Sequence, residues 1–239
     1  MRRFFAPAEN FRPTRVSFGM DETRHLRDVL RLEIGDEVSV FDGEGREFRC
    51  RLREINKKSA ELEIIEETVS ASPESSLDLT LAVTMLKGEK FDLVIQKAVE
   101  LGVTRFVPLI TMRCNVKFKD SQKRLERWRK IILEASKQSG RAKLMSIAEP
   151  VEFKQFLIDR ASEDCVLFSE RGGRRFSTMK KAKKITALVG PEGGWDNSEL
   201  DFAEANRVLV VTLGGRVLRA ETAAIAMAAI LQYRFGDLN

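Results

Sequence analysis

The amino-acid sequence predicts an α/β protein in which a small β-rich domain precedes a larger domain built around a parallel sheet. Residues 37–64 alternate between apolar and polar side chains, as strands with one buried face do. From residue 77 onward, short apolar runs alternate with segments of helical periodicity, which is typical of a parallel sheet covered by helices. The segment TVSASPESS, residues 68–76, is small, polar and contains proline, so we expect a linker between domains at 1–67 and 77–239.

Alternating strands dominate the predicted N-terminal domain. Residues 37–41 form one strand, and a glycine-bearing turn at 42–45 leads into a second strand at 46–55. In the second strand one face is apolar and the other basic, with Phe48, Cys50 and Leu52 opposite Arg49, Arg51 and Arg53. A third strand carries Ala60, Leu62 and Ile64 on its inward face. Before these strands, we expect Asp21 to cap a short helix that buries Leu26, Val29 and Leu30.

The C-terminal domain is predicted from its succession of strands and helices. Apolar runs predict strands at 79–86, 105–110, 165–168, 185–189 and 208–213. Helical periodicity predicts helices at 89–101, 121–139, 151–161 and 221–235, and a further helix that follows Asp196. Asp196 with Glu199 has the spacing of a capping box. The segment 221–235 has no charge between Thr222 and Tyr233, so we expect a buried helix whose small residues allow another helix, from this chain or a second copy, to approach closely.

Composition limits the possible functions. The chain of 239 residues has a net charge of +5, a mild indication of an acidic partner. Its three cysteines lack metal-ligand spacing, and its single histidine, His25, cannot build a histidine site, so we expect no metal and a reducing compartment. The N-terminus has no apolar signal segment, and the apolar helix is too short to span a bilayer. These features predict a cytoplasmic protein without a membrane anchor.

Two segments concentrate positive charge in the C-terminal domain. Residues 113–143 contain 11 Lys+Arg and 3 Asp+Glu, counted from the sequence, and residues 171–184 contain seven basic and no acidic residues. The second segment includes Arg174, Arg175, Lys180 and Lys181. A solvated face is the ordinary explanation of such a run. Two dense basic segments in one domain favour a polyanion instead, and binding would then depend on salt.

Two glycine-bearing turns each follow a predicted strand near the C-terminus. They read GPEGG, residues 190–194, and LGGRVLR, residues 213–219. Glycine allows the backbone to turn sharply or to approach a ligand closely. Ordinary strand-to-helix loops are the alternative for each turn alone. In an open parallel sheet, however, ligands bind at loops of this kind.

These two motifs, in this order after strands, resemble the RsmE family, the 16S ribosomal RNA uridine-N3 methyltransferases of the SPOUT class. The resemblance extends to MRRFF, HLRDVLRLEIGDEVSVFDGEG and LKGEKFDLVIQKAVELGV. The sequence departs from the family at Trp195, where another apolar residue is commoner, and at 141–146, where a proline-containing segment is commoner. The resemblance implies a PUA-like barrel that holds RNA, a C-terminal domain with a trefoil knot, a homodimer, and 16S ribosomal RNA or the small ribosomal subunit as partner.

The resemblance also implies S-adenosyl-L-methionine as cofactor, bound by three loops. The candidate residues are Leu167, Ser169, Glu170, Val189, Gly190, Glu192, Gly193, Gly194, Leu213, Gly214, Val217, Leu218 and Thr222. Glycine turns offer backbone groups to adenine, and a carboxylate such as Glu192 or Glu221 favours the cationic sulfur. We expect bulk at Gly193 to intrude where the backbone meets the ligand.

Uridine N3 must lose a proton when it is methylated, and negative charge then spreads onto the neighbouring carbonyl oxygens. Arg216 or Arg219 stabilises that charge or clamps a phosphate, and the sequence leaves both roles open. Glu221 is a candidate proton acceptor. The candidate RNA-binding residues are Arg2, Arg3, Arg24, Arg49, Arg51, Arg141, Arg174 and Arg175. Two other functions stay open: a SPOUT enzyme that methylates a ribose 2′-hydroxyl, and a non-catalytic RNA-binding or assembly factor.

Overall fold

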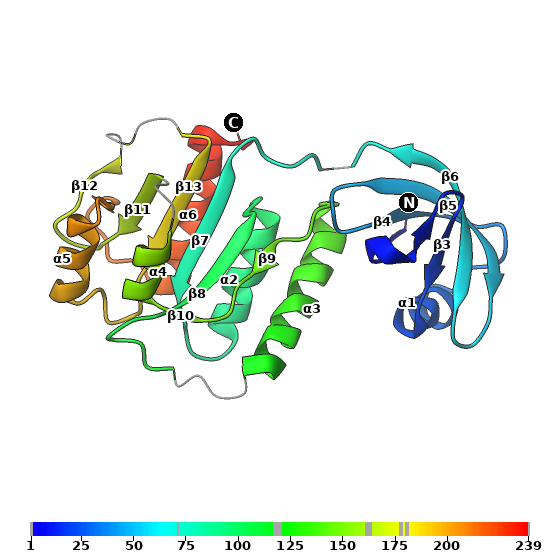
Figure 1. The fold of residues 1–239 in the computed structure, drawn as a ribbon, viewed down its shortest axis with the longest axis horizontal. Coiled ribbons are helices and arrows are strands. Elements are labelled where there is room, and N and C mark those ends of the chain that lie inside the picture. The colour runs from blue at the N-terminus through cyan, green and yellow to red at the C-terminus, as the bar shows by residue number, and fades with distance from the viewer. Residues whose placement is uncertain are drawn as a thin grey trace. The chain divides into compact units, whose positions relative to one another are not determined.

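The computed structural model of the chain describes residues 2–70, 72–116, 121–160, 164–176, 179 and 182–238 (Figure 1). These residues form two compact units. The first unit comprises the chain up to Glu74 together with Leu133–Leu144. The second unit comprises Ser75–Ile132 and the chain from Met145 onward.

The first unit is a curled six-stranded sheet with short helices. Its elements are β1 Arg3–Phe5, η1 Ala8–Asn10, β2 Phe11–Arg12, β3 Arg15–Phe18, α1 Met20–Arg24, the π-helical turn η2 His25–Val29, β4 Glu37–Phe41, β5 Glu47–Ile55 and β6 Ala60–Thr68. The strand order is β1-β4-β5-β6-β3-β2. All pairs are antiparallel except β1 with β4, a parallel pair that the sequence pattern did not indicate.

The predicted alternation in β4 and β5 is confirmed. Val38 pairs with Cys50 and Val40 with Phe48, and all four side chains are buried. The prediction for the first helix is wrong in two respects. Gly19, not Asp21, is the N-cap of α1, and Val29 is 67% exposed. The chain widens into a π-helical turn at η2, so the α-helical spacing that predicted a buried Val29 no longer holds there.

The second half of a long helix packs within the first unit. This helix, α3 (Ser121–Ser139), matches the predicted bounds, but its association with the N-terminal strands was not expected. Arg3 donates a hydrogen bond to the carbonyl oxygen of Ser136 at 2.7 Å, and Lys137 pairs with Glu22. Just beyond the helix, the amide of Leu144 donates to the carbonyl oxygen of Gly43 at 2.9 Å.

The second unit contains a parallel sheet with helices on both faces (Figure 1). Its remaining elements are β7 Asp78–Thr84, α2 Glu89–Glu100, β8 Arg105–Ile110, β9 Ser146–Ile147, β10 Val151–Glu152, α4 Phe153–Asp159, β11 Asp164–Phe168, β12 Arg174–Arg175, β13 Lys184–Val189, α5 Asn197–Ala205, β14 Leu209–Thr212 and α6 Ala220–Phe235. The strand order is β10-β8-β7-β13-β11-β14-β12, with β9 beside β8. The helix predicted at 151–161 is shorter: its first two residues form β10, the chain is extended again at Arg160, and residue 161 lies outside the described residues.

The order of the strands brings four loops to one edge of the sheet. Because β7, β13, β11 and β14 are neighbours and all parallel, their carboxyl ends lie together. Helices α2 and α6 cover one face of the sheet, and α4 and α5 cover the other. No helix among the described residues is long and apolar enough to cross a membrane.

Only one side of α6 is buried in this chain. Ala224, Met227, Ala228 and Leu231 pack inward. The opposite side stays partly exposed, and its residues are Ile225, Ala226, Ala229, Ile230 and Tyr233. A single chain therefore does not bury the predicted all-apolar helix completely.

Candidate functional site

A pocket lies where the loops after β11, β13 and β14 meet α6. It encloses about 530 Å³, its open mouth included. Its lining consists of Phe168, Ser169, Glu170, Val189, Gly190, Pro191, Gly194, Trp195, Leu213, Arg216, Leu218, Ala220, Ala223 and Met227. The walls are largely apolar, and Ser169, Glu170 and Arg216 supply polar groups.

The structure brings about half of the predicted cofactor residues into this pocket. Those that line it are Ser169, Glu170, Val189, Gly190, Gly194, Leu213 and Leu218, together with the predicted catalytic Arg216. Leu167 is buried in the hydrophobic core. The remainder lie outside the lining and are exposed: Glu192, Gly193, Gly214, Val217 and Thr222. The sequence analysis missed the apolar contributions of α6, namely Ala220, Ala223 and Met227.

Trp195 fastens the GPEGG turn to the neighbouring strand. Its indole nitrogen donates a hydrogen bond to the carbonyl oxygen of Phe168 at 2.8 Å, and its ring is buried. A Cβ at Gly190 would lie 2.9 Å from Cε2 and Nε1 of that ring. Glycine is therefore required at 190 by the close approach of the indole. At Gly193 an added Cβ would meet only Arg113, at 3.6 Å, so Gly193 is not crowded by its neighbours.

The end of the same turn closes on the loop after β11. The amide of Gly194 donates to the carbonyl oxygen of Pro191 at 3.0 Å, and the backbone of Gly194 has a positive φ of 70°. A Cβ there would lie 2.5 Å from Oε1 of Glu170. The positive φ favours glycine, whereas the Glu170 carboxylate ends a flexible side chain and can move aside.

Arg113, which the sequence analysis did not single out, also contacts the GPEGG turn. It donates to the carbonyl oxygen of Gly193 at 3.0 Å and to Oδ2 of Asp196 at 3.2 Å. Asp196 caps α5 in the predicted capping box with Glu199, which is confirmed. The hydrogen bonds from Ser198 and then from Arg113 hold the pKa of Asp196 below its usual value.

Three charged side chains from different loops meet beside the pocket. Nζ of Lys90 lies 3.5 Å from Oε1 of Glu192 and 3.6 Å from Oε1 of Glu221. The other oxygen of Glu221, Oε2, is buried and has no hydrogen-bond partner among the described residues. Arg216 and Arg219 are exposed, and within the described part of the chain no ion-pair partner is found for either.

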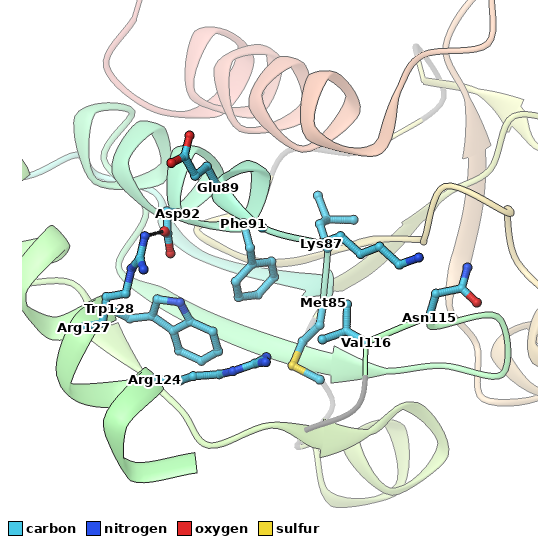
Figure 2. Close-up of a pocket in the computed structure, with 12 residues that line it drawn as sticks. Met85, Lys87, Glu89, Phe91, Asp92, Asn115, Val116, Arg124, Arg127 and Trp128 are labelled. Carbon is cyan, nitrogen blue, oxygen red and sulfur yellow. Dashed lines mark hydrogen bonds and ion pairs between the residues drawn. The ribbon is translucent and has the colours of Figure 1, made fainter. Parts of the chain in front are cut away.

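A second hollow opens at the carboxyl end of β7 and the start of α2 (Figure 2). It encloses about 1030 Å³, its open mouth included. Phe91 and Trp128 pack together with ring centroids 5.1 Å apart, and Arg124 extends toward Met85. Lys87 and Asn115 lie at the far side, while Arg127 pairs with Asp92. The hollow therefore combines cationic side chains with an apolar base.

The candidate RNA-binding arginines differ in their surroundings. Arg3 is bound to Glu47 at 3.0 Å, and Arg141, 3% exposed, pairs with Glu74 at 2.6 Å. These two ion pairs stabilise the first unit internally, which leaves little of either guanidinium for RNA. The exposed candidates are Arg2, Arg24, Arg174 and Arg175.

The arginine row of β5 faces glutamates on both neighbouring strands. Arg51 bonds Glu37 of β4 at 2.7 Å, and Arg49 lies 3.2 Å from Glu66 of β6. Arg51 therefore holds the pKa of Glu37 below its usual value through their hydrogen bond. This pairing favours a solvated, internally neutralised face. Lys180 and Lys181 of the second basic segment lie outside the described residues.

No group of three His, Cys, Asp or Glu side chains placed to hold a metal ion occurs in the described part of the chain. The three cysteines are free thiols. Burial raises the pKa of the Cys50 thiol to about 12, so it is protonated and unreactive at neutral pH.

Comparison with known proteins agrees with this geometry. An RNA methyltransferase domain model matches residues 73–232, and an RNA methyltransferase PUA domain model matches residues 19–65. The ribosomal RNA small subunit methyltransferase E of Synechocystis is 38% identical over 96% of this chain and 76% of its own length. The protein of the same name from Rickettsia conorii is 32% identical over 95% and 91%.

Several solved structures cover nearly the whole chain, and two of them contain the cofactor. The ribosomal RNA small subunit methyltransferase E of Neisseria gonorrhoeae, bound to S-adenosyl methionine, has a TM-score of 0.92 and 35% identity, with 100% of both chains covered. A putative methyltransferase of Legionella pneumophila in complex with the same cofactor has a TM-score of 0.91 and 32% identity, with 99% of both chains covered.

Proposed function

Because the chain belongs to the ribosomal RNA small subunit methyltransferase E family, we propose that it methylates N3 of a uridine in the decoding region of 16S ribosomal RNA. The observation that carries this proposal is the pocket between the loops after β11, β13 and β14, with Glu221 and two arginines that have no ion-pair partner among the described residues. N3 methylation needs a bound methyl donor, a proton acceptor and cationic groups for the developing charge. The described residues provide candidates for each requirement.

S-adenosyl-L-methionine fits the residues that line the pocket. Leu213, Leu218 and Met227 give apolar walls for a planar ring, and Ser169 and the backbone of the glycine turn supply polar contacts. When bound, the cofactor supplies a methyl group on a positively charged sulfur. Glu192 and Glu221 give the neighbourhood a negative charge that favours such a cation.

Side chains of the protein accept the proton of the uracil and stabilise the negative charge that develops on it. The N3–H bond of the uracil breaks, its electron pair stays on nitrogen, and Oε2 of Glu221 accepts the proton. Arg219 lies at the N-cap of α6, two residues before Glu221. It stabilises the negative charge on the carbonyl oxygens, and Arg216 at the pocket lining assists or holds a phosphate.

We place the RNA along the hollow shown in Figure 2 and the edge strand β12. Lys87 and Arg124 around the hollow suit phosphates, and so does Arg127, which pairs with Asp92 but stays 63% exposed. Replacing Arg124 and Arg127 by Gln should weaken RNA binding and reduce its salt dependence, whereas Arg129→Gln on the exposed side of α3 should matter less. If both changes weaken RNA binding equally, the RNA does not lie along the hollow.

We propose a cytoplasmic homodimer. The half-exposed apolar side of α6 and the exposed apolar Val217, at 76%, support burial against a second copy. Sedimentation at micromolar concentration should give a species near twice 27.1 kDa. An active strict monomer would contradict the dimer. The trefoil knot implied by the family stays a prediction, supported by the position of β11 between β13 and β14.

Nucleoside mass spectrometry of ribosomal RNA from cells lacking this protein tests the reaction. Loss of 3-methyluridine, and its return on complementation, is the expected result. Loss of a 2′-O-methyl nucleoside instead would favour the ribose enzyme. RNA affinity without calorimetric binding of S-adenosylmethionine would favour the non-catalytic RNA-binding factor.

A further inference from the structure

Lys90 joins three loops that are distant in sequence. It stands in the first turn of α2, directly after the loop from β7, whereas Glu192 follows β13 and Glu221 opens α6. Its Nζ lies 3.5 Å from Oε1 of Glu192 and 3.6 Å from Oε1 of Glu221. The sequence analysis gave Lys90 no role.

The Lys90 cluster is looser than an ordinary structural ion pair. On the same helix, Nζ of Lys97 lies 2.9 Å from both carboxylate oxygens of Glu100. A charge-assisted hydrogen bond spans about 2.7–2.9 Å, so Lys90 is shared between its partners without a close bond to either. One cation with two carboxylates leaves a net charge of −1.

Glu221 is the member of the cluster that is oriented inward. Its side chain is 14% exposed, against 38% for Glu192. Oε1 faces Lys90, and Oε2 is buried without a donor among the described residues. A buried acceptor without a partner is costly, and a donor from a ligand would remove that cost.

We propose that Lys90 is a positioning residue of the methyl-transfer site that acts through Glu221. This inference rests on the proposed function. By holding Oε1, Lys90 directs Oε2 toward the N3–H of the acceptor uracil. When Oε2 takes the proton, Lys90 stays paired with Glu192, so the cluster passes from a charge of −1 to neutrality. The second carboxylate thus explains how a lysine can hold a proton acceptor without blocking it.

A double-mutant cycle distinguishes this positioning role from a purely structural role in holding the loops together. Methyl transfer to 16S ribosomal RNA is measured for wild type, Lys90→Gln, Glu221→Gln and the double variant. We expect Lys90→Gln to lower kcat/KM at least tenfold in wild type but less than about threefold in the Glu221→Gln background. Lys90→Arg should restore part of the rate. Lys97→Gln, which breaks an ion pair on the same helix away from the site, should change the rate less than about twofold.

A binding measurement supplies a second readout that needs no turnover. In Lys90→Gln two carboxylates remain near the cofactor without the lysine charge. S-adenosylmethionine has a positively charged sulfur and S-adenosylhomocysteine does not. Calorimetry should therefore find that the ratio of their affinities shifts about fivefold in favour of S-adenosylmethionine. Lys97→Gln should leave that ratio unchanged. Equal losses of rate in both backgrounds, or an unchanged affinity ratio in Lys90→Gln, would overturn the inference. Absence of methyl transfer by the wild type would instead refute the proposed function.

Discussion

The contact between Gly190 and the Trp195 ring predicts a large effect from adding one methyl group. In Gly190→Ala, the new Cβ would lie 2.9 Å from Cε2 and Nε1 of the indole and 3.2 Å from Cδ1. The ring must shift, which disturbs its hydrogen bond to the carbonyl oxygen of Phe168. Overpacking costs about 1–3 kcal/mol, and the hydrogen bond contributes about 1 kcal/mol. We expect the free energy of unfolding to fall by about 2–4 kcal/mol.

Urea unfolding of matched variants measures this effect. Gly215→Ala is the control, because no atom lies within 4 Å of the added Cβ and the residue has no positive φ. Trp195→Leu removes the indole, so Gly190→Ala in that background should cost less than about 1 kcal/mol. Calorimetry should also find weaker S-adenosylmethionine binding in Gly190→Ala than in the control. If Gly190→Ala is equally destabilising with and without Trp195, the steric explanation is refuted.

Three further predictions concern other parts of the chain. Asp196→Ala removes the cap of α5 and should lower the free energy of unfolding by about 0.5–2 kcal/mol, measured by urea denaturation; an unchanged midpoint would contradict the cap. The pKa of Cys50 rises from 9.0 to about 12 on folding, so stability should fall by about 1.4 kcal/mol per pH unit between those values, because only the unfolded thiol ionises. Cys50→Ala should remove that part of the fall and Cys114→Ala should keep it; identical pH profiles for the two variants would refute the assignment. Arg174→Gln with Arg175→Gln should weaken RNA binding and flatten its salt dependence at constant cofactor affinity, and an unchanged salt slope would return β12 to an ordinary solvated edge.

Features determined by neighbouring residues were predictable from the sequence. The alternation in β4 and β5, the bounds of α3 and the capping box of Asp196 with Glu199 all depend on local periodicity or spacing. The π-helical turn after α1 was not predictable in this way, because its extra residue per turn leaves no distinct hydrophobic pattern.

Features that depend on contacts between distant segments could not be predicted without the folded structure. The two glycine motifs predicted where ligand-binding loops lie, but not that Gly190 faces an indole while Gly193 faces Arg113. The positions of Arg113 and Lys90 depend on which strands are neighbours, and the periodicity of the sequence does not reveal the order of the strands. The burial of Arg3 and Arg141 likewise depends on Glu47 and on the distant Glu74.

The inclusion of Leu133–Leu144 in the first unit bears on how the protein is made. During synthesis, residues up to Glu74 emerge long before the segment that completes their unit. Until then the guanidinium of Arg3 lacks the carbonyl oxygen of Ser136, and Glu22 lacks Lys137. The N-terminal unit therefore cannot be completed as an independent early product of translation. A fragment cut at the apparent linker would lack part of its own structure, because the first unit is completed only by Leu133–Leu144.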